Sequence, residues 1–293
     1  MALDLPDLKK ILYSRVNELP TLPVVIPKIL QMMEDNKSDV KKISEVISYD
    51  PALVSKILKV ANSSYYGFPK KISEIDRAVS LLGFNMVKSL AVSLGVVNTL
   101  SEPRSKRFFS ETGLWFHSVA VATLTRELCL NIIKTKKKDY LFVAALLHDI
   151  GKLVFDIFFS DLFEQAVLDV QNSGTYSLAK SEKKIIGVDH GEAGALLLKR
   201  WNFPDEISDP VMYHHSQDIP SNVSSEDMSI LRICDALCQE FFYESIDDIP
   251  DPRISETDLE NIAIKNSDIK KLEDFLHNNK QNIADFFQSI YQV

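Results

Sequence analysis

Histidine and aspartate are the side chains of this sequence best suited to chemistry, and most of the histidines fall in one region. The chain has six histidines, five of which occur between residues 117 and 235. Together with two aspartates they form an ordered set: His117, His148, Asp149, His190, His214, His215 and Asp235. Imidazole and carboxylate are the usual ligands of zinc, iron, manganese and related divalent ions. The set therefore suggests a divalent metal site.

The neighbours of these residues support this interpretation. Trp115, Phe116 and Val119 surround the first histidine, and Leu146 and Leu147 precede the second. An ionisable group among apolar residues is costly to bury unless it is paired or bound to metal. A single buried histidine is more often a hydrogen-bonded core residue, so the prediction rests on the whole set. The sixth histidine, His277, is expected to lie at the surface.

The elements that must bring these residues together are helices. The chain has only 9 glycines, and alternating strand patterns are scarce, so an all-α fold is expected. Apolar spacing predicts helices that carry or flank the set at 114–130, 140–147, 156–171, 177–186, 190–201, 207–215 and 229–243. A helical bundle can direct side chains from several helices at one interior point.

The pattern divides the chain into three parts. Residues 1–100 are expected to form a helical N-terminal subdomain, and residues 101–245 a helical bundle that carries the metal site. Residues 246–293 form a C-terminal helical extension. The polar stretch 101–107 marks the first boundary, and an acidic, proline-containing linker at 246–252 marks the second.

Several helix ends can be predicted within these parts. Asp50 followed by Pro51 is a strong helix start, and Asp189 is suited to cap a helix that begins at His190. Ser73 with Asp76 resembles a capping box. Gly83 is expected to end the helix that this box would begin.

Charge and hydropathy argue against two classes of function. The net charge is −8, so the chain lacks the basic face that general nucleic-acid binding requires. No apolar run reaches the ~18 residues of a membrane span, so no membrane insertion is expected. Lys134–Lys138 is a short basic run, expected to be a solvated loop or helix end.

The cysteines point to a reducing compartment. Cys129, Cys234 and Cys238 are an odd number, and the N-terminus lacks a signal-peptide pattern, which favours reduced thiols in the cytoplasm. Cys234 and Cys238 are expected to be small core residues. A thiolate metal pair is the alternative, but it lacks further cysteines nearby.

The order of the histidines and aspartates, and the run Leu147–Lys152 (LHDIGK), resemble the HD superfamily of metal-dependent phosphohydrolases. Five further segments are similar to the HDOD family: Leu19–Pro23 (LPTLP), Asp50–Leu53 (DPAL), Ala61–Gly67 (ANSSYYG), Ala78–Gly83 (AVSLLG) and Asp189–Trp201 (DHGEAGALLLKRW). The resemblance covers roughly residues 17–245. It implies an all-α fold and a place in bacterial signalling and regulation.

The resemblance also implies roles for the site residues. Asp149 would bridge two ions. His117, His148 and Asp235 would complete one position, and His190, His214 and His215 the second. Neighbours on a helix point about 100° apart, so one member of the 214–215 pair could instead orient a ligand or a bound water. The metal would be iron, manganese, zinc, nickel or magnesium.

Three functions remain open on the sequence alone. The first is a regulatory module whose site holds metal or a nucleotide and whose surface contacts a signalling protein. The second is a phosphohydrolase acting on a nucleotide or phosphate ester, with Asp149 and Lys152 as catalytic residues. In that case Lys152 would pair with a substrate phosphate. The alternative for Lys152 is a solvated lysine at a turn. The third is a metal-free helical scaffold. Because no Gly-Tyr-Pro motif follows His215, cyclic di-GMP hydrolysis is not expected.

Overall fold

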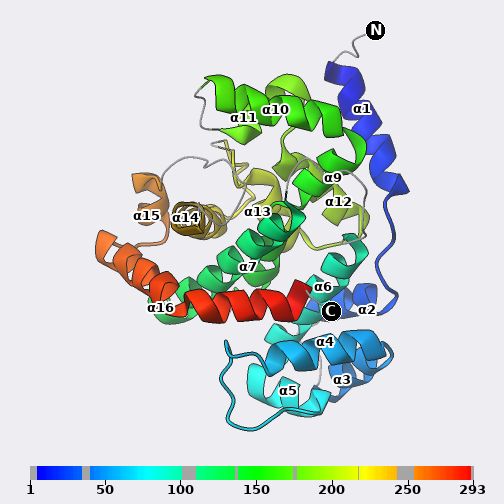
Figure 1. The fold of residues 1–293 in the computed structure, drawn as a ribbon, viewed down its shortest axis with the longest axis vertical. Helices are drawn as coiled ribbons and strands as arrows, with labels where there is room; N and C mark the ends of the chain where they lie inside the picture. The colour runs from blue at the N-terminus through cyan, green and yellow to red at the C-terminus, as the bar shows by residue number, and fades with distance from the viewer. Residues whose placement is uncertain are drawn as a thin grey trace.

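The computed structural model describes residues 5–34, 40–100, 110–135, 138–173, 177–216, 218–242 and 254–291. Every regular element in these ranges is a helix, so the expected all-α fold is confirmed (Figure 1). The N-terminal helices are α1 (Leu5–Arg15), α2 (Val25–Glu34), α3 (Val40–Ser48), α4 (Pro51–Ala61), α5 (Ile75–Leu82) and α6 (Phe84–Leu100). A 3₁₀ turn, η1 (Val16–Glu18), follows α1.

The remaining helices carry the candidate site and the C-terminal segment. They are α7 (Glu111–Glu127), α8 (Tyr140–Leu147), α9 (Ile150–Phe158), α10 (Ser160–Ser173), α11 (Leu178–Ile185), α12 (His190–Arg200), α13 (Asp205–Tyr213), α14 (Ser225–Phe242), α15 (Glu256–Asn261) and α16 (Asn266–Tyr291). A π-helical turn, η2 (Leu128–Ile132), extends α7.

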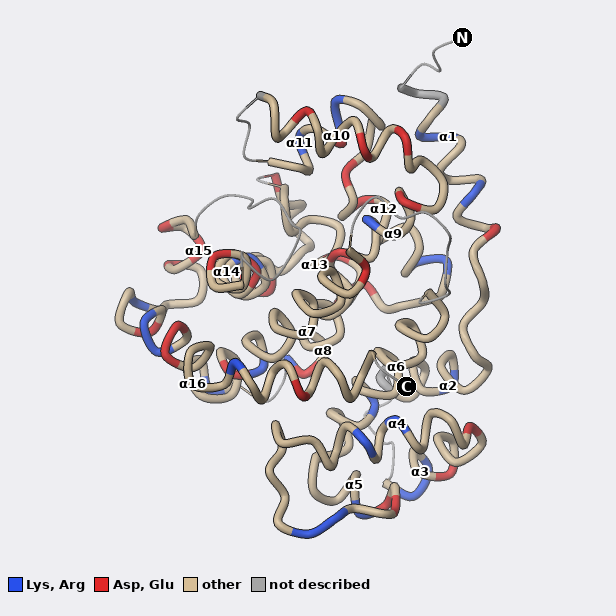
Figure 2. Tube along the Cα trace, viewed as in Figure 1, with Lys and Arg blue, Asp and Glu red and all other residues tan. Residues whose placement is uncertain are grey.

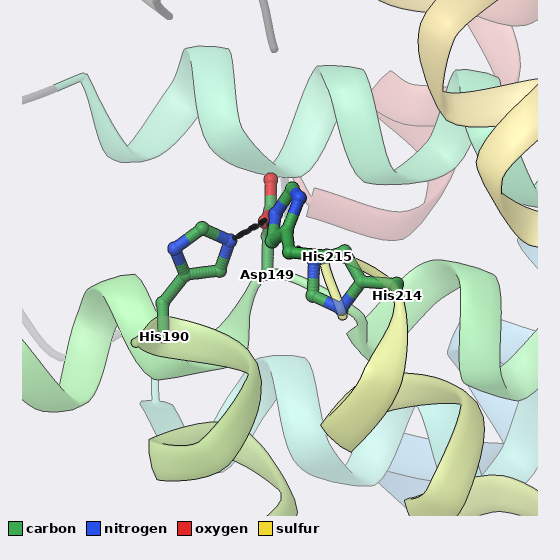
Figure 3. Close-up of side chains that lie close together, drawn as sticks. All are labelled: Asp149, His190, His214 and His215. Atoms are coloured by element: carbon green, nitrogen blue, oxygen red, sulfur yellow. Dashed lines mark hydrogen bonds and ion pairs between the residues drawn. The ribbon is translucent and has the colours of Figure 1, made fainter. Parts of the chain in front are cut away.

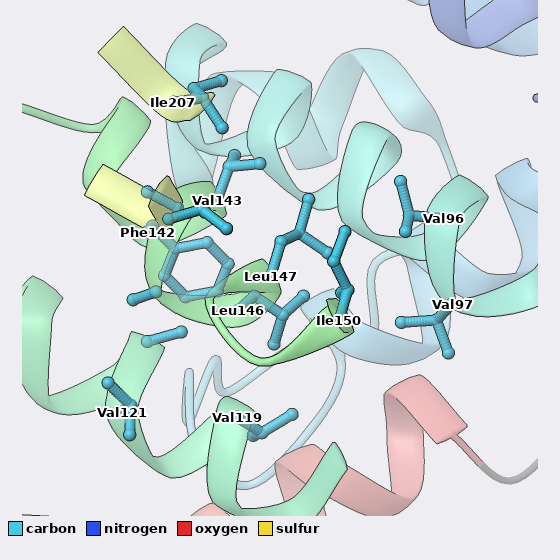
Figure 4. Close-up of a cluster of buried hydrophobic side chains, with 14 of the residues drawn as sticks. Val96, Val97, Val119, Val121, Phe142, Val143, Leu146, Leu147, Ile150 and Ile207 are labelled. Atoms are coloured by element: carbon cyan, nitrogen blue, oxygen red, sulfur yellow. The ribbon is translucent and has the colours of Figure 1, made fainter. Parts of the chain in front are cut away.

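Helix α8 lies at the centre of the core. Its sequence, YLFVAALL, is apolar on all faces, which is typical of a helix that is buried all round. It packs against α6, α7 and α13. Figure 4 shows Val143, Leu146 and Leu147 of this helix among buried side chains from its neighbours. Outer helices such as α11 and α16 carry both acidic and basic residues along their length (Figure 2).

Helix α16 ties the C-terminal segment to both earlier parts of the chain. It packs against α7 and also against α4 (Figure 1). Tyr65 stacks on Phe286 of α16 at 4.9 Å between ring centroids, and the hydroxyl of Ser64 donates to Asp285 at 2.7 Å. One connected cluster of buried apolar residues extends from α1 to α16. The stretches 101–107 and 246–252, at which the sequence was divided, lie outside the described residues.

Two of the predicted helix starts are confirmed, and one is wrong. Asp50 caps α4 by accepting from the Leu53 backbone N–H at 3.0 Å, and Asp189 caps α12 through the Glu192 N–H at 2.8 Å. The capping box of Ser73 and Asp76 does not form, because α5 begins later, at Ile75, with no side-chain cap. The apolar stripe of α5 determines its position, and a local cap pattern is too weak to shift it.

The single helix predicted over 156–171 is also wrong. The chain bends at Phe159, so α9 and α10 are separate helices. The bend allows Phe159 and Phe163 to turn into the core, where they are 8% and 2% exposed. Periodicity does not reveal such a break, because both sides of it keep helical spacing.

Within the described residues, no helix combines the length and hydropathy of a bilayer span. Helices α5 and α6 reach those values only jointly, across a bend of 117°.

Candidate metal centre

The predicted ligand residues lie around one buried point, although they come from five separate parts of the fold. They are carried by α7 (His117), the α8–α9 junction (His148, Asp149), the first residue of α12 (His190), the turn after α13 (His214, His215) and α14 (Asp235). The possible ligand atoms of six of them form two groups, each within 4.8 Å, and Asp149 belongs to both. Asp235 lies outside these two groups and joins the first through His117 and His148. That these residues act as metal ligands remains a prediction; their convergence is an observation.

The first group is built around the α8–α9 junction. His117 Nε2 lies 2.8 Å from Asp235 Oδ1 and 3.9 Å from Asp149 Oδ2. His148 Nε2 lies 3.3 Å from Asp149 Oδ2 and 3.5 Å from Asp235 Oδ1. Two carboxylates and two imidazoles therefore face one small volume. Gln239 steadies one of the carboxylates by donating to Asp235 at 3.1 Å.

The second group uses the other oxygen of Asp149 (Figure 3). His190 Nε2 lies 3.2 Å from Asp149 Oδ1, and His214 Nε2 lies 4.0 Å from the same oxygen. His215 Nε2 is 2.8 Å from His190 Nε2. Because its two oxygens face different sets of imidazoles, Asp149 occupies the place expected of a bridging carboxylate.

Both members of the 214–215 pair belong to this group. Helix α13 ends at Tyr213, so His214 and His215 lie in a turn rather than on a regular helix. Their ring centroids are only 3.9 Å apart. The divergence of about 100° expected of helical neighbours therefore does not separate the two rings.

Backbone carbonyls orient two of the imidazoles. His148 Nδ1 donates to Ala145 O, and His214 Nδ1 donates to Val211 O, each at 2.7 Å. These bonds place a proton on Nδ1 and direct Nε2 towards the centre. Burial lowers the pKa of His148, but Asp149 and Asp235 outweigh it and raise that pKa. Both Nε2 atoms are buried and make no hydrogen bond. Buried polar atoms are rarely left unpaired, so their position next to carboxylate oxygens suits a cation. The residues present thus fit a divalent metal.

Electrostatics keep both aspartates charged. Burial alone would raise the pKa of Asp235, but His117 and His148 hold it well below its usual value. Burial also opposes ionisation of Asp149, and His148 and Lys152 outweigh it, so its pKa is likewise well below normal. Ionised carboxylates are the form that binds metal.

The imidazoles of the second group differ from one another. Burial lowers the pKa of His190, but the carboxylates of Glu182 and Asp149 outweigh it and raise that pKa to about 10. Burial, followed by the neighbouring His215, lowers the pKa of His214 well below its usual value. His214 is therefore neutral, as a metal ligand must be. Glu182 and Asp149 favour a positive charge at His190. A metal ion bound to His190 would supply that charge in place of the proton.

Sequence reasoning missed Glu182, on α11. Its Oε2 accepts from His190 Nδ1 at 2.7 Å and from the His190 backbone N–H at 2.9 Å. A carboxylate behind a histidine fixes its tautomer and raises its basicity, as in many metal sites. Glu182 is fully buried. No local signal distinguishes it, because glutamate on an amphipathic helix is normally exposed.

Lys152 lies inside the centre rather than in solvent. It is 6% exposed, and its Nζ donates to Asp149 Oδ2 at 2.9 Å. A solvated lysine at a turn, which the sequence left open, is therefore contradicted.

A glycine lets α9 and α12 approach closely enough to form the centre. A Cβ on Gly151 would lie 1.8 Å from the carbonyl oxygen of His190 and 2.8 Å from the backbone nitrogen of Gly194. Any other residue would have to push α12, with His190, away from Asp149. Gly151 is part of the run Leu147–Lys152, but the sequence does not disclose this steric role.

The HDOD domain pattern matches residues 19–217, about two thirds of the chain. The chain belongs to the HDOD family. The match contains six of the seven predicted ligands and ends before α14, which supplies Asp235. The resemblance inferred from the sequence motifs is thus confirmed.

Solved structures share the HDOD fold over nearly the whole chain. An HDOD domain protein of unknown function from Geobacter sulfurreducens has a TM-score of 0.79 and 22% identity, and 99% of this chain and 98% of that one are covered. A Shewanella amazonensis protein whose name proposes a phosphohydrolase has a TM-score of 0.74 and 24% identity, with 95% and 97% covered. A Marinobacter aquaeolei protein whose name proposes signal transduction has a TM-score of 0.78 and 20% identity, with 98% and 66% covered.

Curated relatives are longer than this HDOD chain. An uncharacterized protein of Treponema pallidum is 26% identical over 208 residues, covering 69% of this chain and 39% of its own. The chain spans between about a third and two fifths of the length of the two curated relatives that it matches.

Proposed function

We propose that this protein is a bacterial regulatory HDOD module whose His/Asp centre holds two divalent metal ions bridged by Asp149, and whose helical surface contacts a signalling protein. The observation that carries the metal assignment is the convergence of the buried Nε2 atoms of His148 and His214 on the carboxylate of Asp149, at 3.3 and 4.0 Å, with neither nitrogen making a hydrogen bond. A cation between these groups satisfies both lone pairs and charges.

Burial of the centre supports a regulatory role. His148 is fully buried, and Asp149 and His214 are 2% and 3% exposed; His215 is only half-buried. A centre this enclosed holds an ion more readily than it admits a large ester. The signalling name of one structural neighbour and the greater length of the curated relatives also favour a module that works within larger systems.

Metal analysis tests the proposal directly. Protein loaded with Mn²⁺ or Fe²⁺ and freed of excess ion should retain about two ions per chain, as in two-metal sites. Asp149→Ala should lose both, because each position shares that carboxylate. His277→Ala is the matched control, since His277 is exposed and contacts Phe241 rather than the centre, and it should retain both ions. A wild-type chain without metal, or Asp149→Ala with full loading, would overturn the proposal.

A second candidate function is hydrolysis of a small phosphate ester or nucleotide. The buried ammonium of Lys152, held 2.9 Å from Asp149, favours it, because it could offset the charge of a substrate phosphate. When bound, the metal pair would supply an activated water with a pKa near ~7. Asp149 would hold the ions, and the surrounding apolar residues would limit the access of bulk water.

Turnover measurements separate the two candidates. Aryl phosphates and nucleotides would be incubated with Mn²⁺-loaded or Fe²⁺-loaded protein, with Asp149→Ala as the background. Lys152→Met should lower turnover while the metal content persists. Absence of turnover above background in a fully loaded chain would exclude hydrolysis of these esters and leave the regulatory proposal intact.

A further inference from the structure

Arg232 of α14 binds the turn that carries two of the predicted ligands. Its Nε donates to the carbonyl oxygen of His214 at 2.9 Å, and one terminal nitrogen donates to the carbonyl oxygen of Tyr213 at 3.0 Å. The same nitrogen also donates to the carbonyl oxygen of Ser216. One guanidinium therefore holds three carbonyl groups of a short segment.

These carbonyls lie past the regular hydrogen bonding of α13, and of the three only that of Tyr213 accepts from the turn itself, from the Ser216 N–H at 2.9 Å. Helix α13 ends at Tyr213, and the last carbonyls of a helix lack intrahelical donors. The planar fork of arginine can satisfy several acceptors in a fixed geometry, which lysine cannot do. By fixing the backbone at His214 and on both sides of it, Arg232 also fixes where the rings of His214 and His215 point.

The other side of Arg232 faces the C-terminal segment. Its remaining terminal nitrogen lies 3.6 Å from Oδ1 of Asp258, on α15. Asp258 is 6% exposed and accepts from the Ser229 hydroxyl at 2.9 Å. Asn261 donates to the same hydroxyl at 3.0 Å. Helix α15 is thus joined to α14 by a partly buried polar network that ends on Arg232.

We infer that Arg232 is a positioning residue for the second metal position, formed by His190, His214 and His215, and that Asp258 places this position under the control of α15. The inference rests on the proposed function and adds a regulation of the same centre. Both residues lie beyond the residues 19–217 that match the family, so the control belongs to the C-terminal part of this chain.

The two metal positions should respond differently to loss of the contacts between Arg232 and the turn after α13. The first position depends on His117, His148 and Asp235, none of which Arg232 bonds. Arg232→Gln should therefore weaken binding of the second ion by about 10–100-fold, a usual effect of removing an outer partner of a ligand, and leave the first ion unchanged. Asp258→Asn can still accept from the Ser229 hydroxyl but loses its charge opposite Arg232. It should also weaken binding of the second ion, by a smaller factor than Arg232→Gln.

A calorimetric titration with Mn²⁺ measures the affinities of the first and second metal positions separately. Electron paramagnetic resonance of the Mn²⁺-loaded protein gives a further readout. Two exchange-coupled Mn²⁺ ions do not show the signal of an isolated Mn²⁺ ion. That signal should reappear in Arg232→Gln, in which only the first position is occupied. Arg200→Gln is the matched control. Arg200 also donates to two backbone carbonyls, those of Leu19 and Asn17, but at the far end of α12, so its loss should lower stability without changing either metal affinity.

The outcomes separate this inference from the proposed function. A wild-type chain that binds no metal removes the proposed function and, with it, the inference. Two ions bound with wild-type affinities in both Arg232→Gln and Asp258→Asn would overturn the inference alone. Arg232→Lys should recover only part of the second affinity; full recovery would show that charge, and not the carbonyl contacts, is what matters. If Arg232→Gln does not fold, Asp258→Asn alone decides.

Discussion

Three imidazoles of the centre are oriented by a contact of the ring nitrogen that faces away from it. His148 and His214 use nearby backbone carbonyls, whereas His190 uses the carboxylate of Glu182. A carbonyl fixes the tautomer, and a carboxylate in addition strengthens the imidazole as a donor. At the residue scale, therefore, His190 is the ligand whose basicity depends on a carboxylate behind it, that of Glu182 on the preceding helix.

Replacing Glu182 with glutamine tests that dependence. Glu182→Gln keeps the size of the side chain but removes its charge, so metal affinity should fall by about 10–100-fold. Calorimetric titration with Mn²⁺ measures the change. Asp169→Asn is the control, because Asp169 bonds Ser181 and Lys184 near the surface and lies outside the centre. Equal affinities in the wild type and Glu182→Gln would remove Glu182 from the metal site.

The cysteines give a second residue-scale prediction, independent of metal. All three are buried and free, as expected of small core residues. Burial raises the pKa of the Cys129 thiol to about 12, and it also raises the pKa of Cys234 and Cys238. At pH 8 these thiols stay protonated and inert, since the thiolate is the nucleophile. Iodoacetamide should leave the folded protein unmodified and alkylate all three residues in denaturant, as measured by mass spectrometry. Rapid labelling of the folded chain would contradict their burial.

At the scale of elements, the centre exists because α9, α12 and α13 pack closely. The junction of α8 and α9 carries Asp149 without using its side chain as a cap, so both oxygens face the imidazoles. Gly151, one residue into α9, faces the carbonyl of His190 at the start of α12. The distance between the two helices is thus set by the absence of a side chain.

Gly151→Ala should disturb folding and metal binding together. The added Cβ would meet backbone that cannot move aside, and overpacking of this kind costs about 1–3 kcal/mol. Thermal unfolding and metal content should both decrease. Gly83→Ala is the comparison, because Gly83 has a positive φ of 91° and open space around it. That variant should lose stability through backbone strain and keep its metal. Full metal content in Gly151→Ala would show that α12 can adjust.

At the scale of the whole molecule, the centre is enclosed by one connected core. Buried apolar side chains run from α1 to α16, and the ligands come from segments more than a hundred residues apart. An ion at this point would add bonds between helices that come from distant parts of the chain. Metal binding should therefore stabilise the entire fold.

Removing the metal tests this link. An ion present at a hundred times its dissociation constant stabilises a fold by about 2.7 kcal/mol, provided that the unfolded chain does not bind it. Treatment with a chelator should therefore lower Tm in the wild type. In Asp149→Ala, chelator and Mn²⁺ should leave Tm unchanged. If neither the chelator nor Mn²⁺ changes the Tm of the wild type, the chain does not hold a structural ion.

The sequence by itself determined the features that depend on residue type and local order. Few glycines and helical spacing predicted the all-α fold, and the motifs predicted the HDOD family. The caps at Asp50 and Asp189 needed only their neighbours in the chain. The ligand candidates could be named because histidine and aspartate are conspicuous among apolar residues.

Only the tertiary structure decided the features that depend on contacts between separate helices. Glu182 and Arg232 look like ordinary surface residues until α11 and α14 pack against the centre. The bend at Phe159 arises because two helices must cover different parts of the core. Helical periodicity is a local property, whereas a partner for a buried nitrogen or carbonyl is supplied by whichever helix folds against it.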